Sequence, residues 1–112
     1  MGKVIESPVK EFPGTVEIFQ PVPYPEFITW EKKIAESDEA LQLVIKGDPK
    51  YTQGEAEYLT WKAIAGMVQN WNIEKFDISK PSADPRVSVM QLMAWLVREI
   101  GKVINGDVDA KK

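Results

Sequence analysis

The proline-rich segment between residues 11 and 25, EFPGTVEIFQPVPYP, restricts the fold of this chain more than any other stretch. Within it, residues 15–19 alternate, with Val16 and Ile18 on one face, a pattern typical of a half-buried strand. An FPG turn precedes this alternation and three prolines follow it. Because proline has no N–H to donate to a sheet, the sequence predicts a short strand that ends by Gln20.

The residues before this strand contain a candidate partner for it. Val4, Ile5 and Val9 are apolar and could pair with residues 15–19 in a hairpin. Pro8 lacks a donor, so the partner strand would lie at the edge of a sheet. An exposed edge of this kind can also pair with another protein.

Pro25 suits the first turn of a helix, where its missing N–H would have no partner in any case. The residues after it predict a helix whose apolar face is made of Phe27, Ile28, Trp30, Ile34 and Ala35. The sequence ESD then interrupts the pattern. Residues 39–46 predict a short second helix ended by Gly47, or alternatively a strand.

Thr52 and Glu55 have the spacing of a capping box and predict the start of the next helix. No charge occurs in residues 63–72, so this helix is predicted to be the most buried. Its apolar stripe is Tyr58, Trp61, Ile64, Ala65, Val68 and Trp71.

Residues 72–85 are predicted to connect this helix to the last one, with three apolar residues attaching the connection to the core: Ile73, Phe76 and Ile78. Asp84 and Pro85 predict the start of the last helix, with Ser88 as a competing N-cap. The stripe of this helix is Val89, Leu92, Met93, Leu96, Ile100 and Val103. Asn105 and Gly106 are predicted to end it.

Together these elements predict a mainly α protein with a short N-terminal β-strand or hairpin arm, of the α+β class, with a compact bundle of three to four helices. With 112 residues, 44% of them hydrophobic, the chain can form one domain without disulfides. We expect residues 1–24 to form the arm, 25–105 the helical core and 106–112 a frayed tail.

The composition argues against several classes of function. Fourteen basic and seventeen acidic residues give a net charge of −3, which disfavours nucleic acid as a partner. Cysteine and histidine are both absent, which removes the usual nucleophiles, bases and transition-metal ligands. We therefore expect no catalytic residue, no cofactor, no metal site and no enzymatic activity. No apolar run approaches the roughly 18 residues of a membrane span, and the N-terminus lacks the apolar segment of a signal peptide, so we expect a cytoplasmic protein.

Glu31 is the most informative acidic residue, because the helical pattern places it among Phe27, Ile34 and Ala35. A carboxylate buried there must find a hydrogen-bonding partner. One interpretation is a structural bond to Arg86, Arg98, a tryptophan N–H or backbone amides. The other is a contact with a partner protein or a pH-sensitive lock.

The four tryptophans divide by position. Trp61 and Trp71 lie on the stripe of the central helix and are predicted to be core, whereas Trp30 lies at the edge of its stripe. Trp95 lies off the last helix's stripe. It either packs beneath the N-terminal arm or stacks on Arg98, or it is exposed and contacts another protein. We name as candidate protein-binding residues Trp95, Met90, Arg98 and Trp30.

Three blocks of sequence, residues 12–34, 64–76 and 85–106, resemble small proteins of tailed bacteriophages and prophages of the tail assembly chaperone type. They carry the FPG turn and strand, a proline before the first helix with an acid near Glu31, the tryptophan-containing VQNWNI, and a final helix after a proline. The resemblance covers about 60 of the 112 residues. It implies a protein of virion morphogenesis, without catalytic residues, that binds the helical tape measure protein in the host cytoplasm.

This resemblance leaves two other functions open. The chain could be a permanent part of the virion, such as a tail or head–tail component, whose arm adds a strand to a neighbour. It could also be a small regulatory or inhibitory module that binds a host protein. Self-association through the exposed arm is a further expectation.

Overall fold

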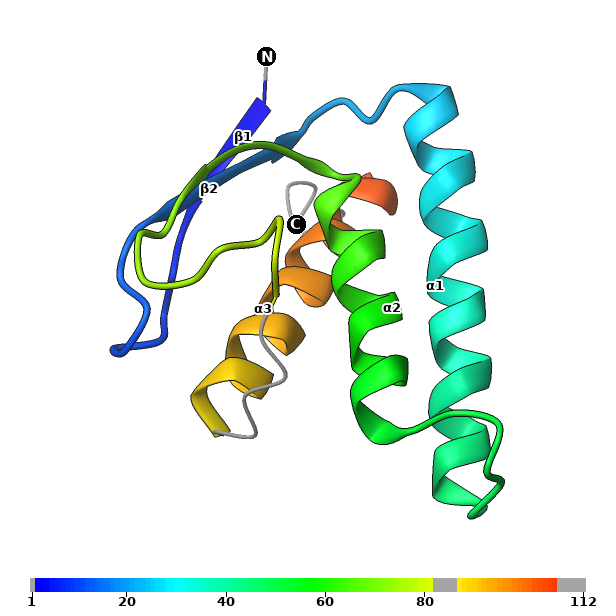
Figure 1. Cartoon of the computed structure of the whole chain (residues 1–112). Coiled ribbons are helices and arrows are strands. Elements are labelled where there is room, and N and C mark those ends of the chain that lie inside the picture. Colours follow the sequence, from blue (N-terminus) through cyan, green and yellow to red (C-terminus); the bar gives the residue numbers. More distant parts are fainter. Residues whose placement is uncertain (1, 82–86, 107–112) are drawn as a thin grey trace.

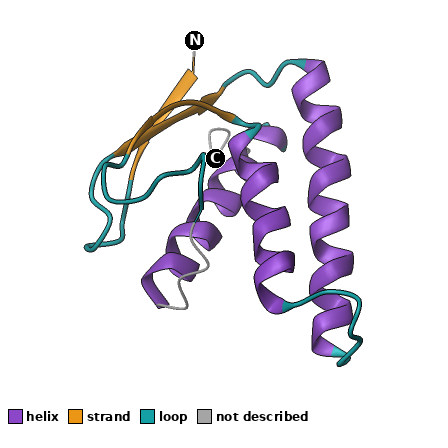
Figure 2. Ribbon diagram, viewed as in Figure 1, coloured by secondary structure: helices purple, strands orange, loops and turns teal. Residues whose placement is uncertain are grey.

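The computed structural model of the chain describes residues 2–81 and 87–106. These residues form three strands and three helices (Figure 1), in the order β1 (Gly2–Glu6), β2 (Thr15–Phe19), α1 (Tyr24–Ile45), α2 (Gln53–Ala65), β3 (Val68–Asn72) and α3 (Val87–Ile104). The strands lie on one side of the molecule and the helices on the other (Figure 2).

The strands form an antiparallel sheet in the order β1-β2-β3, with β2 in the centre. The strand predicted over residues 15–19 is confirmed at both ends. Its hairpin partner is confirmed in part: Val4 and Ile5 lie in the edge strand β1, with Ile5 opposite Val16 of β2, whereas Pro8 and Val9 follow the end of the strand. Val16 and Ile18 are fully buried, so the alternation seen in the sequence marks the inner face of the sheet.

The predicted extension of the central helix to Trp71 is wrong, because α2 ends at Ala65 and residues 68–72 form β3. Val68 and Trp71 are spaced by three residues, which is typical of a helix. In the sheet they lie opposite Ile18 and Val16, which are spaced by two. A β-bulge takes up the extra residue and returns both apolar side chains to one face.

The predicted break in the first helix is also wrong, because α1 is continuous through the ESD sequence and through residues 39–46. Ser37 of that sequence is buried, and its hydroxyl shares a hydrogen bond with the hydroxyl of Thr60 in α2. A polar residue with a buried partner does not interrupt a helix. Gly47 follows the helix with a positive φ of 81°, which confirms the predicted end.

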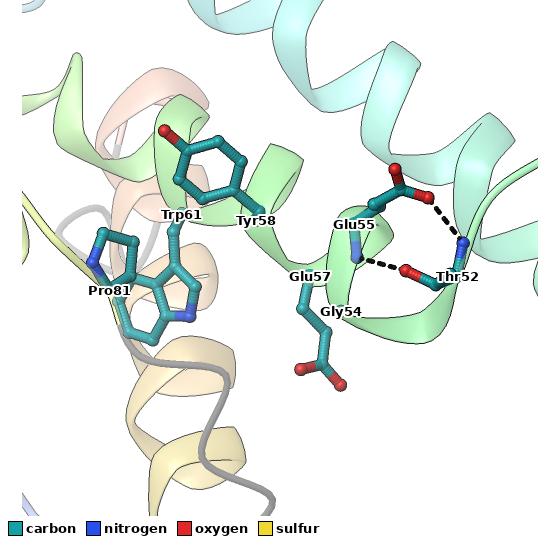
Figure 3. Close-up of a pocket in the computed structure, with 7 residues that line it drawn as sticks. All are labelled: Thr52, Gly54, Glu55, Glu57, Tyr58, Trp61 and Pro81. Atoms are coloured by element: carbon teal, nitrogen blue, oxygen red, sulfur yellow. Dashed lines mark hydrogen bonds between the residues drawn. The ribbon is translucent and has the colours of Figure 1, made fainter.

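α2 begins with the predicted capping box (Figure 3). The Thr52 hydroxyl accepts from the Glu55 backbone N–H at 3.1 Å, and the Glu55 carboxylate accepts from the Thr52 N–H at 2.8 Å. α2 then lies antiparallel beside α1. The start predicted for α3 at Asp84 and Pro85 lies outside the described residues, and Ser88 lies inside α3 rather than at its N-cap.

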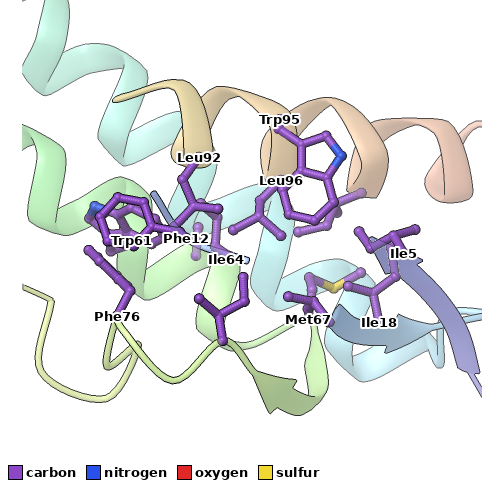
Figure 4. Packing of buried hydrophobic residues seen from close by; sticks show 14 of the residues in the cluster. Ile5, Phe12, Ile18, Trp61, Ile64, Met67, Phe76, Leu92, Trp95 and Leu96 are labelled. Atoms are coloured by element: carbon purple, nitrogen blue, oxygen red, sulfur yellow. The ribbon is translucent and has the colours of Figure 1, made fainter. Parts of the chain in front are cut away.

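The core lies between the inner face of the sheet and the helices α2 and α3. In Figure 4, Ile5 and Ile18 of the sheet, together with Met67, point toward Trp95 and Leu96 of α3. The predicted stripe of α3 is confirmed: Val89, Leu92, Leu96, Ile100 and Val103 are buried, and Met93 is half-buried. The α+β class is observed, but a helical bundle is not confirmed, because the sheet forms one wall of the core.

The connection between β3 and α3 is attached to the core as predicted. Ile73 and Phe76 are buried, and Ile78 is half-buried. The Phe76 ring lies 4.7 Å from Trp61, centroid to centroid, and the Trp71 indole N–H donates to the Phe76 carbonyl at 2.6 Å. Trp61 is therefore core as predicted. Trp71 is half-buried, and its hydrogen bond to Phe76 attaches the connection to β3.

Candidate protein-binding groove

α1 is covered on one side only. Trp30, Ser37 and Ala40 are buried on the side that faces α2. A neighbouring row of the helix carries Phe27, Ile34 and Leu41, which are only half-buried. Apolar residues that remain half-accessible along a helix are candidates for contact with another molecule.

α3 has a matching uncovered side. Beside its buried stripe runs a second row at alternating spacings of three and four residues, with side chains that are half-buried or exposed. We call this row the outer stripe; it consists of Val87, Met90, Ala94, Val97, Gly101 and Ile104. It contains no charged residue, and its spacing is that of a helix-pairing seam.

Two cavities follow one another between these two helices. The first, of about 410 Å³, is lined by Ile34, Ser37, Asp38, Leu41, Thr60, Met93, Ala94, Val97 and Arg98. The second, of about 460 Å³, is lined by Gln20, Pro21, Val22, Tyr24, Phe27, Val103, Ile104 and Gly106. Residue numbers rise along α1 as they fall along α3, so the two helices run antiparallel on either side. We refer to the two cavities and their walls as the α1–α3 groove.

The bottom of the groove contains the one pair of buried polar side chains among the described residues, Ser37 and Thr60. Their hydroxyls hydrogen-bond to each other, and Thr60 also donates to the Ala56 carbonyl at 3.4 Å. Buried polar groups are stable when they are paired in this way. The pair joins α1 to α2 beneath a cavity whose other polar lining residues are Asp38 and Arg98.

Glu31 is exposed, so the predicted burial of its carboxylate is wrong. α1 turns Trp30 and Ser37 toward α2, which leaves Glu31 in the row of Phe27, Ile34 and Asp38. A carboxylate at this exposed position remains hydrated and requires no hydrogen-bonding partner within the protein. Of its predicted partners, Arg86 lies outside the described residues.

Two of the four candidate protein-binding residues are buried. Trp95 is 5% exposed and belongs to the same buried cluster as Ile5 and Ile18 of the arm, so the alternative of an exposed Trp95 is wrong (Figure 4). The sheet accounts for this burial. It covers the side of α3 that carries Trp95, next to the predicted apolar stripe. Trp30 is 7% exposed and packs against α2.

The other two candidates are exposed, and one of them lines the groove. Arg98 is exposed and lines the first cavity. Met90 is 45% exposed and lines neither cavity; it lies in the outer stripe one turn before Ala94, which lines the first cavity. Sequence reasoning missed Val97, Gly101 and the half-buried row of α1. The spacing of the outer stripe was a usable signal for the α3 wall.

A smaller cavity, of about 350 Å³, lies on another side of the molecule, beside the start of α2 (Figure 3). Its lining includes Tyr58, Trp61, Pro81 and the capping-box residues. Tyr58 is half-exposed, and the Lys62 ammonium lies 5.4 Å from the centroid of its ring. The lining combines the polar residues Thr52, Glu55 and Glu57 with the rings of Tyr58 and Trp61.

The described residues contain no cluster of acidic side chains able to hold a metal ion. Within the same ranges, no helix has the length and apolar character needed to cross a membrane. The pKa of the Asp77 carboxyl lies below its ordinary value, because the hydroxyl and the backbone N–H of Ser79 both donate to it. This carboxylate stabilises a turn between β3 and α3.

The chain was compared with known protein families, proteins and structures. No protein family, curated protein or solved structure gives a match to the chain.

Proposed function

We propose that this protein is a non-enzymatic tail assembly chaperone of the tailed-bacteriophage type, and that it binds a helical segment of the tape measure protein in the host cytoplasm. The observation that carries the proposal is the α1–α3 groove. The resemblance of residues 12–34, 64–76 and 85–106 to such chaperones supplies the identity of the partner.

The shape of the groove favours a helix as its occupant. Both walls are helices: the α1 residues that line the cavities run from Tyr24 to Leu41, about 27 Å at 1.5 Å per residue, and those of α3 run from Met93 to Ile104. A helix laid in such a groove buries its own apolar face against both walls. A chaperone of a long helical protein needs a surface of this kind and needs no reactive side chain.

Small residues in the outer stripe leave room for the backbone of a partner to come close. Ala94 and Gly101 alternate with the larger Met90 and Val97. Apart from its chain neighbours and the backbone of its own helix, a methyl group placed on Gly101 would meet no atom of the described residues within 4 Å. Gly101 lies in the outer stripe between Val97 and Ile104, which line the two cavities, so a large side chain there should reach into the groove without disturbing the core.

The test is co-expression with the tape measure protein, followed by purification of the complex. Gly101→Trp is the blocking variant, and Thr29→Trp is its control, because Thr29 is an exposed, neutral residue on the far side of α1. We expect the wild type and Thr29→Trp to retain the tape measure protein and Gly101→Trp to lose it. Equal retention by both variants would contradict binding in the groove.

A second measurement separates the chaperone from a permanent virion component. β1 lies at the edge of the sheet, the position from which a strand can pair with a neighbour, as that alternative requires. A chaperone acts during assembly and should be missing from purified virions. Its presence there, at a fixed ratio to the tail proteins, would favour the structural role.

A further inference from the structure

The two walls of the α1–α3 groove differ in charge. Along α1, the residues 27, 31, 34, 38, 41 and 45 share one side of the helix, and this row carries two exposed carboxylates, Glu31 and Asp38, and no basic residue. Along α3, the outer stripe is uncharged, and Arg98 lies at its outer rim. The negative charge of the groove is thus concentrated on one wall.

We propose that this asymmetry selects the occupant: an amphipathic helix with lysine or arginine along the flank that faces α1. This inference rests on the proposed function and adds the chemical character of the helix that binds. Glu31 and Asp38 are seven residues apart and lie about two helical turns from each other. Basic residues at the same spacing on the occupant can contact both carboxylates at once.

The spacing also restricts how the helix lies. Its apolar residues must face the outer stripe while its basic flank faces α1, so a helix with charge on one flank fits in one direction only. Paired charges at the rim of an interface contribute more to orientation and selectivity than to total affinity. Glu31, which lies in the middle of an apolar row, thereby gains a role as a selector of the partner.

The experiment uses two synthetic helical peptides of about 20 residues, a length that matches the groove. Both carry the same leucine and isoleucine stripe at heptad spacing. One has lysine along one flank, and the other has glutamate at the same positions. Binding to the full chain is followed by fluorescence anisotropy in low and high salt.

We expect the lysine peptide to bind roughly tenfold more tightly than the glutamate peptide in low salt. The preference should shrink in 1 M salt, where the screening length falls to about 3 Å. In the double variant Glu31→Lys/Asp38→Lys, the preference should reverse. The control Glu36→Lys/Glu39→Lys makes the same change in net charge on the other side of α1 and should keep the wild-type order.

Three results would overturn the inference. If both peptides bind equally and Gly101→Trp abolishes both, the groove binds helices without the proposed selectivity, and the proposed function stands. If the control variant reverses the order as well, the preference reflects net charge alone. If neither peptide binds, the inference falls, and the proposed function is decided by co-expression with the tape measure protein.

Discussion

The two long sides of α3 differ in how completely they are covered. On the side that faces the sheet, Trp95 and Leu96 lie beneath β1 and β2 and are almost fully buried. On the side that faces the groove, Met90 is 45% exposed and Val97 is half-buried. Both sides are apolar, so hydrophobicity alone does not tell which one is the core.

The difference has a structural cause. β1 and β2 pair in a hairpin that lies over α3, and Lys3 of β1 forms an ion pair with Glu99 of α3 at 3.8 Å. α1 packs against α2 and reaches α3 only across the groove. One apolar side of α3 therefore contributes to stability, and we expect the other to contribute to binding.

The largest expected effect is that of Trp95→Ala. Removing this buried ring should destabilise the protein by about 3–5 kcal/mol, because a cavity would be left between α3 and the sheet. Val97→Ala, two residues later on the groove side, should cost about 1 kcal/mol or less, since its site is already half-accessible. Urea unfolding of both variants measures the difference. Equal losses of unfolding free energy in the two variants would show that both sides of α3 contribute equally to stability.

The sequence predicted those parts of the fold that local rules determine. The prolines defined the end of β2, Thr52 and Glu55 defined the start of α2, and periodicity defined the buried stripe of α3. Trp95 was left between two interpretations, because its burial depends on a sheet that is distant in the sequence. The same holds for Ser37, whose partner is 23 residues away.

Only the α3 wall of the groove had a signal in the sequence, the spacing of the outer stripe, and the groove as a whole was not predictable. Sequence patterns show which side chains are apolar, but not which of them the fold leaves half-covered. Ile34 was predicted as part of the apolar face of the first helix and Val97 was in no predicted stripe, and only the placement of α1 relative to α3 makes them the walls of a groove. β3 was missed for a related reason, since a bulge gives its apolar residues the spacing of a helix.

Ser37→Ala tests the polar pair at the bottom of the groove. Loss of this buried hydrogen bond should cost about 1–2 kcal/mol, because the Thr60 hydroxyl would keep only its long bond to the Ala56 carbonyl, at 3.4 Å. The double variant Ser37→Ala/Thr60→Val should lose less than the sum of the two single changes, since both remove the same bond. Thermal unfolding of the three variants completes the cycle. Strict additivity would mean that the two hydroxyls do not interact.

Gly101→Ala tests the groove side of α3 with a change that should raise stability rather than lower it. Alanine in the interior of a helix should stabilise the protein by about 0.5–1 kcal/mol relative to glycine, provided that its methyl group meets no neighbour. The open space around Gly101 fulfils that condition. We expect the melting temperature to rise by a few degrees. A lower melting temperature would show that Gly101 packs against another part of the chain and does not face the groove.

Met90→Ala has the smallest expected effect on stability. Met90 is 45% exposed, so truncation should change the free energy of unfolding by less than about 0.5 kcal/mol. Methionine adapts its shape to a partner, and its loss should weaken binding of the lysine peptide by several-fold. Leu92→Ala, on the buried stripe half a turn away, is the control: it should lower the melting temperature strongly while any folded fraction still binds. A Met90 variant that is destabilised and binds normally would assign the outer stripe to the core.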